Sequence, residues 1–288
     1  MELFAQTAVN AVYAASYIAL IAVGLVLIFG VMGVVNFAHG ELYMLGAYVV
    51  VFAYADHGVP YLLTVALGLV LVGLLGIAME RGLFRPMRTN PLGGLIVSIG
   101  ALLMLQSAVA AMFGVRMETI PRALPGAVPL MGGVAIPTQR LLVIGAAVVL
   151  LGALWLFLKK SKFGWALRAC AQDPEAAALQ GISIDRTARL AMFIGAALAG
   201  VAGALTAPLV RTFPYMGHSV IVTAFIVIIV GSLGSLEGAV LASVLYAFVH
   251  TFVTTFSDGV VADIVGLLLM LIVLVVRPYG LFGTRERA

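Results

Sequence analysis

Asn36, His39 and Glu41 place an amide, an imidazole and a carboxyl inside the otherwise apolar stretch GVMGVVNFAHGELYMLGAY. Such side chains can bind a polar solute or a metal, or they can satisfy backbone groups where a membrane helix is interrupted. A metal-binding spacing such as H-E-x-x-H is absent, so we expect no metal site. Gly33 precedes the group and Gly40 lies within it, and together they predict a helix break with a loosened backbone that the three polar side chains brace.

A second polar group lies in GSLGSLEGA, late in the chain. Glycines permit tight turns and close helix contacts, and serine hydroxyls can satisfy nearby backbone groups. The candidates here for a helix break or a translocation path are Gly231, Gly234, Ser235 and Glu237. Further along, His250 and Asp263 are expected either to pair between helices or to lie near the membrane surface. For both groups, bracing of a break and direct contact with a permeant remain open, and for the first group so do gating and contact with a partner protein.

The composition indicates what surrounds these polar residues. The chain has 288 residues, of which 63% are hydrophobic and 10% are charged, and its mean hydropathy is +1.18. A soluble domain usually has about 25% charged residues. We therefore predict an all-α, polytopic transmembrane bundle that forms a single domain over residues 1–288. The lone Cys170 excludes an internal disulfide framework.

Hydropathy and helix breakers divide the chain into about eight to nine spans. A span needs about 20 apolar residues, and short or glycine-interrupted segments point to discontinuous helices. The second, seventh and ninth segments are short in this sense. The expected spans are 5–29, 41–56, 61–79, 92–113, 140–158, 189–210, 219–233, 238–256 and 260–276.

The basic residues predict how the chain is oriented. Most of the 16 Lys and Arg lie in the connections 80–91 and 159–189 and in the C-terminal tail. Such residues are enriched on the cytoplasmic side, so the N-terminus is predicted outside and the C-terminus inside. This placement between spans does not indicate nucleic-acid binding. The outer connection 114–139 is rich in Pro and Gly, and it is either a docking surface or a passive loop.

The connection 159–189 contains the signals of a short helix over residues 174–180. Asp173 can cap its first turn, and Pro174 suits the first helical position. Glu175 favours the positive helix end, and Gly181 allows the left-handed residue that stops a helix. So short a helix is not stable alone. It must pack against this chain or the membrane surface, or insert into a cytosolic partner.

Here the sequence resembles a known family. EAAALQG resembles the EAA loop of bacterial ABC importer permeases, which couples the permease to its ATPase. Together with NFAHGELYMLGAY, ERGLFRPMR, GSLGSLEGA and RPYGLFG, it resembles the permease subunits of the branched-chain amino-acid ABC importer family, LivH-type. The resemblance assigns ATPase coupling to Arg168, Asp173, Pro174, Glu175, Ala176, Ala177 and Gly181.

The resemblance also implies a location and partners. The chain would be a multi-pass permease of the bacterial inner membrane, in contact with lipid and with a periplasmic N-terminus and a cytoplasmic C-terminus. A paralogous second permease, two cytoplasmic ATPase subunits and a periplasmic substrate-binding protein would complete the importer. The chain lacks a G-x-x-x-x-G-K-[ST] phosphate loop, so ATP and Mg are expected on the ATPase subunits. The chain itself is expected to be non-catalytic and to bind no cofactor.

The expected substrates are branched-chain or other hydrophobic amino acids. Where many family members have GGLGS, this chain has GSLGS, and Glu237 replaces a small residue or Pro. These departures leave urea, short amides and aromatic acids as alternatives within the same architecture. An ion-coupled secondary transporter would also explain broken helices and buried carboxyls. An intramembrane enzyme using His39 or Glu41 lacks the paired catalytic groups that such chemistry needs.

Overall fold

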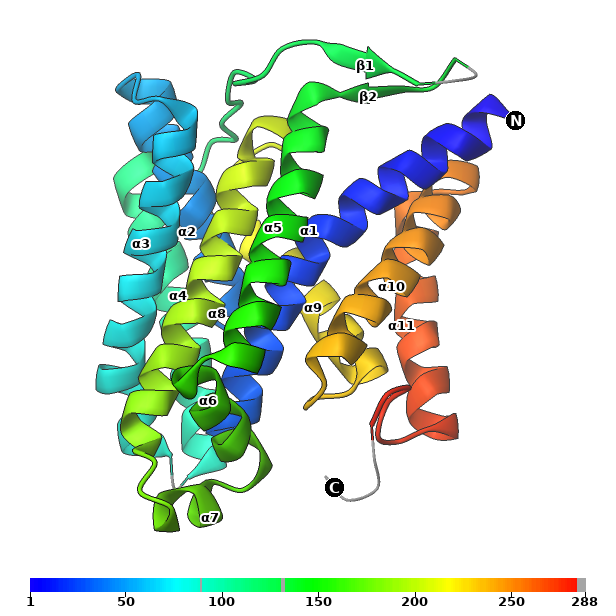
Figure 1. Ribbon diagram of the computed structural model, residues 1–288. Coiled ribbons are helices and arrows are strands. Elements are labelled where there is room, and N and C mark those ends of the chain that lie inside the picture. The colour runs from blue at the N-terminus through cyan, green and yellow to red at the C-terminus, as the bar shows by residue number, and fades with distance from the viewer. Residues whose placement is uncertain (89, 131–132, 284–288) are drawn as a thin grey trace.

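The computed structural model describes residues 1–88, 90–130 and 133–283 and has the predicted all-α architecture (Figure 1). Short π- or 3₁₀-helical turns extend three of the helices: η1 (Val51–Asp56), η2 (Glu80–Phe84) with η3 (Arg85–Met87), and η5 (Ala207–Leu209). The α-helices are α1 (Glu2–Met32), α2 (His39–Val50), α3 (Tyr61–Met79), α4 (Pro91–Phe113), α5 (Thr138–Lys160), α6 (Lys162–Gln172), α7 (Pro174–Leu179), α8 (Ile184–Thr206), α9 (Gly217–Gly231), α10 (Leu236–Phe256) and α11 (Gly259–Val276).

Every span predicted from the sequence corresponds to one of these helices. In the described part of the chain, seven helices are long and apolar enough to cross a membrane. The α9 helix has 15 residues, and α2 has 12 before it continues into η1. Both are shorter than the roughly 20 residues of a full crossing. The seventh predicted span, α9, is therefore short, as predicted. The second comprises α2 and η1, so it is a helix whose geometry changes part-way. The ninth was also expected to be short, and this prediction is wrong, because α11 is long enough to cross a membrane.

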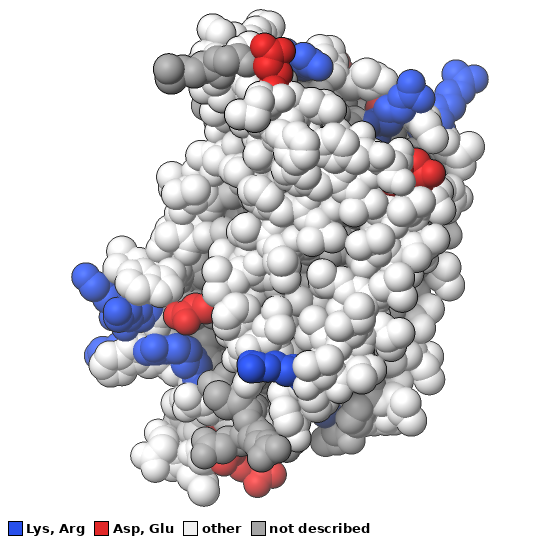
Figure 2. Space-filling view, turned by 90° about the vertical axis from the view of Figure 1, so that its right-hand side faces the viewer, with Lys and Arg blue, Asp and Glu red and all other residues white. Residues whose placement is uncertain are grey.

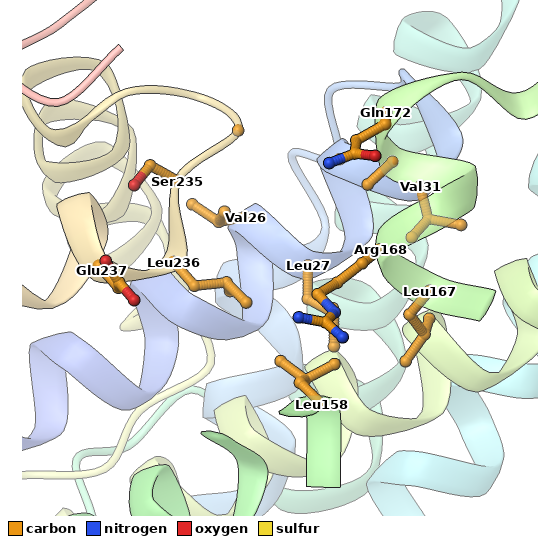
Figure 3. Close-up of a pocket in the computed structure, with 13 residues that line it drawn as sticks. Val26, Leu27, Val31, Leu158, Leu167, Arg168, Gln172, Ser235, Leu236 and Glu237 are labelled. Atoms are coloured by element: carbon orange, nitrogen blue, oxygen red, sulfur yellow. The ribbon is translucent and has the colours of Figure 1, made fainter. Parts of the chain in front are cut away.

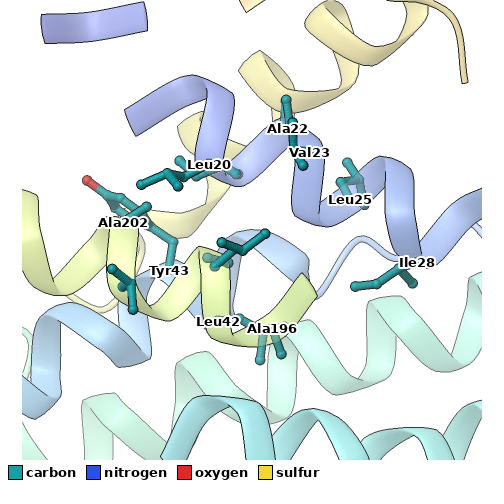
Figure 4. Packing of buried hydrophobic residues seen from close by; sticks show 14 of the residues in the cluster. Leu20, Ala22, Val23, Leu25, Ile28, Leu42, Tyr43, Ala196 and Ala202 are labelled. Atoms are coloured by element: carbon teal, nitrogen blue, oxygen red, sulfur yellow. The ribbon is translucent and has the colours of Figure 1, made fainter. Parts of the chain in front are cut away.

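Two helices form the centre of the bundle. In α1 and α8 most residues are buried by the rest of the chain, whereas α5 and α11 are buried along a minor part of their length. Figure 1 shows α9, α10 and α11 on one side of α1, with α2, α3, α5 and α8 on the other. The apolar core lies where α1, α2 and α8 meet, and Figure 4 shows Leu25, Leu42 and Ala202 as members of this core, one from each of the three helices.

Glycines bring α1 and α2 into backbone contact with α8. A Cβ atom built on Gly24 of α1 would lie 2.7 Å from the carbonyl oxygen of Gly195 in α8. A Cβ atom on Gly203 of α8 would overlap the carbonyl oxygen of Tyr43 in α2. Small residues permit such contact in membrane bundles, where packing and hydrogen bonds replace the hydrophobic effect as the driving force.

The two ends of the bundle differ in structure. The connection 114–137 forms an antiparallel hairpin of β1 (Ala127–Pro129) and β2 (Ala135–Pro137), which the sequence did not predict. It crosses one end of the bundle, while α6 and α7 lie at the other, called the α7 end below (Figure 1). Figure 2 shows charged side chains toward both ends, with an uncharged belt between them on this face. This belt has the character of a surface that contacts hydrocarbon.

Candidate functional site

The break between α1 and α2 is a short hook that turns back along α1. The α1 helix ends at Gly33, whose φ of 64° is left-handed and whose N–H donates to the carbonyl of Phe29 over 2.8 Å. Six residues later, the His39 Nε2 donates to the carbonyl of Ile21 over 3.0 Å. Ile21 precedes the end of α1 by three turns, which is roughly 16 Å. The α2 helix therefore begins deep inside the bundle.

Polar side chains brace this hook. The Asn36 side-chain oxygen accepts from the N–H of Ala38 over 3.0 Å, and the Ser98 hydroxyl accepts from the N–H of Phe37 over 3.2 Å. Asn36, His39 and Ser98 are each at most 1% exposed. Backbone groups freed at a break need such partners where water is excluded. The contacts of Asn36 and His39 favour bracing of the break over contact with a permeant.

Glu41 lies where two helices begin. It is fully buried in the first turn of α2, and its Oε1 accepts from Gln106 Nε2 of α4 over 3.0 Å. Its carboxyl also packs against Gly217, the first residue of α9. Helix N-termini carry partial positive charge, which a nearby carboxylate stabilises. The Glu41 carboxyl therefore lies at the junction of α2, α4 and α9, with its Oε1 bonded and its Oε2 without a partner among the described residues.

Gly40 has a different role from the one predicted. The prediction that it loosens the backbone is wrong, because Gly40 lies within α2. A Cβ atom on Gly40 would overlap the carbonyl oxygen of Gly217 and would lie 2.9 Å from Cβ of Ile221. Its lack of a side chain therefore lets α2 and α9 approach closely.

The second break is a tight turn between α9 and α10. The α9 helix ends at Gly231, and Ser232 adopts a φ of 111°. The Ser235 hydroxyl accepts from the N–H of Gly238 over 3.0 Å and so caps α10. A Cβ atom on Gly231 would lie 2.6 Å from the carbonyl carbon of Gly238. The predicted uses of glycine for close contact and of serine for capping are both confirmed here.

The predicted short helix is present as α7, with sharply defined ends. The Asp173 Oδ1 accepts from the N–H groups of Glu175 and Ala176, each over 2.9 Å. Gly181 has a φ of 81°, its N–H donates to Ala178, and the N–H of Ile182 donates to Ala177. These bonds form a Schellman motif. All of these contacts are local, so residue types at fixed spacing could predict them.

The α7 helix is anchored by one residue and is otherwise exposed. Ala177 is 4% exposed and belongs to the core, whereas Leu179 is 87% exposed. Glu175 and Ala176 are also exposed. Figure 1 shows α7 at the extremity of the bundle. A helix that presents an apolar side chain beyond the bundle is suited to contact with another protein.

An ion-pair cluster that the sequence reading missed holds the start of α8 beside α7. Asp185 of α8 accepts from Arg88 Nη1 over 2.6 Å and also pairs with Arg85. Arg88 pairs in turn with Glu80, whose side chain is fully buried. The cluster ties the connection after α3 to the segment that follows α7. Both predicted basic connections therefore lie at the α7 end.

A cavity of about 250 Å³ joins two groups of candidate residues that lie far apart in sequence. Arg168 and Gln172 of α6 line it together with Gly234 and Ser235 of the α9–α10 turn and Glu237 of α10. Figure 3 shows Arg168 and Glu237 on different helices, with Leu27 and Leu236 between them in this view. Asn36, His39 and Glu41 do not line this cavity.

A separate cavity of about 210 Å³ lies between α1, α9, α10 and α11. His250 and Asp263 line it, and His250 Nε2 lies 3.1 Å from Asp263 Oδ1. The predicted pairing of these two residues between helices is confirmed.

Known proteins resemble the chain along nearly its full length. Residues 7–274 match the family described as the permease component of the branched-chain amino acid transport system. The chain belongs to this permease family. BraD of Pseudomonas aeruginosa, a permease protein of a high-affinity branched-chain amino acid transport system, is 33% identical over 297 residues, which cover 98% of this chain and 97% of that protein. The corresponding LivH of Escherichia coli K12 is 33% identical over 298 residues, which cover 98% and 96%.

A solved structure also has a similar fold. It is described as PsaBC from Streptococcus pneumoniae in complex with Fab. The TM-score is 0.50 at 14% identity, with 91% of this chain and 89% of that chain covered. At this identity the likeness concerns the fold alone. Family and helices together make the chain a multi-pass membrane permease of the branched-chain amino acid transport family, as its motifs predicted.

Proposed function

We propose that the chain is the permease subunit of an ATP-driven importer of hydrophobic amino acids in the bacterial inner membrane. Its partners are a paralogous permease, two ATPase subunits that bind ATP and Mg on the cytoplasmic side, and a periplasmic binding protein that delivers the substrate. The observation that carries the proposal is α7, whose ends are fixed by Asp173 and Gly181 while Leu179 is exposed. The family relationship supports the substrate class.

The coupling role rests on how α7 is attached. Core packing of Ala177 and the pairing of Asp185 with Arg88 fix the base of the helix. A force applied to the exposed side of α7 is therefore transmitted to α8, which is buried along most of its length. An ATPase subunit that contacts Leu179 could in this way move the centre of the bundle.

The substitution Leu179→Ser tests this contact. The side chain is 87% exposed, so its replacement should leave the folding of the permease itself unchanged. We expect Leu179→Ser to reduce co-purification of the ATPase subunits and leucine-stimulated ATP hydrolysis. Met117→Ser, at the hairpin end and 58% exposed, serves as the matched control. Equal ATPase recovery from the two variants would remove α7 from the interface.

Uptake measurements separate the importer from its alternatives. In proteoliposomes that contain the full complex and binding protein, leucine uptake should require ATP hydrolysis. Uptake by this chain alone, driven by an ion gradient, would instead identify a secondary transporter. Competition by leucine, urea, short amides and benzoate-like acids would assign the substrate among the remaining candidates.

A further inference from the structure

The cavity between α6 and the α9–α10 turn combines opposite charges with an apolar lining. Arg168 contributes a guanidinium from α6, and Glu237 contributes a carboxylate from the first turn of α10. Leu27 of α1, Leu158 of α5 and Leu236 of α10 supply aliphatic surface. Figure 3 shows the guanidinium of Arg168 beside Leu27 and Leu158.

The side chains of Arg168 and Glu237 do not stabilise the fold through polar contacts. Among the described residues, the side chains of Arg168 and Glu237 form no hydrogen bond or ion pair. At the same end of the bundle, Arg85 and Arg88 are both paired with Asp185. Both residues are exposed, so their charged groups are accessible from solvent and can contact a ligand that brings opposite charges.

We propose that this cavity binds a free α-amino acid with an aliphatic side chain. Arg168 receives the carboxylate, since a guanidinium matches a carboxylate with paired N–H donors. Glu237 accepts from the ammonium group, and Leu27, Leu158 and Leu236 contact the side chain. The site rests on the proposed function and deepens it, because it names the chemical class held on the cytoplasmic side after transport.

Size and charge together select this ligand. The cavity volume of about 250 Å³ lies just below the roughly 300–1,000 Å³ of pockets for drug-sized molecules, which suits a small amino acid. Urea and short amides have no charges to match either residue. An aromatic acid would use Arg168 but would leave Glu237 facing a ring. A zwitterion with an aliphatic side chain uses both charges and the apolar surface.

The ligand can reach this cavity from the α7 end. A neighbouring cavity of about 710 Å³ shares Gly30, Ala171, Gln172 and Gly234 with it and extends to Pro278 and Tyr279. These residues follow α11, at the end where α6 also lies (Figure 1). The two cavities together form a route by which an amino acid can enter from or leave to the cytoplasm.

Photolabelling locates the ligand. The full complex in nanodiscs, without binding protein and without nucleotide, is illuminated with the diazirine analogue of L-leucine. We expect labelled peptides from residues 158–172 and 234–237, and we expect excess L-leucine but not urea to suppress the label. Labelling elsewhere, or labelling here that excess leucine does not reduce, would overturn the proposal.

Ligand analogues then assign each charge. Arg168→Gln and Glu237→Gln should each weaken leucine binding about tenfold or more. Leucinamide lacks the carboxylate, so Arg168→Gln should not change its affinity. 4-Methylpentanoate lacks the ammonium group, so Glu237→Gln should not change its affinity. Arg186→Gln, an exposed arginine of the same end that does not line the cavity, should bind all three ligands normally.

Two outcomes of this series overturn the proposal. One is unchanged leucine affinity in both variants, and the other is an equal loss of leucine and leucinamide binding in Arg168→Gln. ATP-driven uptake, measured in parallel, separates the two proposals. Uptake of leucine without labelling of the cavity would reject this site and leave the importer standing. A complex that transports no amino acid with ATP would reject the importer itself.

Discussion

Replacing Gly46 by alanine should force α2 and α8 apart. A Cβ atom on Gly46 would overlap the carbonyl oxygen of Gly200 and would lie 2.6 Å from its carbonyl carbon and 2.7 Å from its Cα. Carbon atoms in van der Waals contact lie about 3.5–4.0 Å apart, so the helices must separate by about 1 Å. A gap of that size forfeits roughly a quarter to a half of the dispersion attraction between the facing atoms.

The cost follows from this separation. Overpacking a well-packed core costs about 1–3 kcal/mol, and here the clash involves backbone, which cannot change rotamer. Alanine returns about 1 kcal/mol through its higher helix propensity. Because a backbone clash lies at the upper end of this range, about 3 kcal/mol, we expect Gly46→Ala to lower the free energy of unfolding by about 2 kcal/mol. The unfolding temperature should fall by about 4–8 °C for a chain of this size.

Circular dichroism during heating of the purified chain in detergent measures this change. Gly145→Ala is the matched control, because a Cβ atom there would meet nothing within 4 Å and the variant gains the same helix propensity. We expect the control to unfold at or above the temperature of the parent chain. If Gly46→Ala and Gly145→Ala unfold at the same temperature, the backbone contact between α2 and α8 does not exist as described.

Two further substitutions probe the α7 end. Asp173→Ala removes the cap of α7 and should cost about 1 kcal/mol locally, seen as roughly fivefold faster hydrogen exchange of the α7 amides; exchange at the parent rate would contradict the capping role. Asp185→Asn should loosen the start of α8 by about 1 kcal/mol or less, since the Asp185 side chain is 35% exposed and exposed pairs are weak. High salt should mimic this substitution in the parent and have little effect in the variant, whereas equal salt sensitivity in both would argue against the ion pairs.

The sequence was most informative where structure is local. The ends of α7 follow from Asp173, Pro174 and Gly181 at fixed spacing, and each makes the predicted backbone geometry. The spans follow from long apolar runs between breakers, because the bilayer imposes a minimum length. The hairpin of β1 and β2 was not predicted, because its short strands lie among proline and glycine residues, which indicate only a loop.

Contacts between segments that are distant in the chain could not be predicted from local residue patterns. Nothing near Gly40 in the sequence indicates that α9 packs against it, and the pairing of Arg88 with Asp185 joins segments far apart in the chain. Arg168 and Glu237 were expected to serve separate tasks, coupling and translocation, whereas the fold places both at one cavity. The pattern of apolar residues along a helix shows which face is buried, but it does not show which other helix covers that face. Contacts of this kind therefore could not be predicted from the sequence.

The hook between α1 and α2 has a consequence for how the chain is made. The α2 helix starts deep in the bundle with a buried histidine and carboxyl, and it is too short to cross the hydrocarbon alone. Its neighbours are Gly200 of α8 and Gly217 of α9, which the ribosome synthesises much later. The first helices therefore wait at the membrane in an unfinished arrangement until the last third of the chain arrives. A chain truncated before α8 should lack the helices against which α2 packs. The N-terminal and C-terminal parts of the chain must therefore fold together.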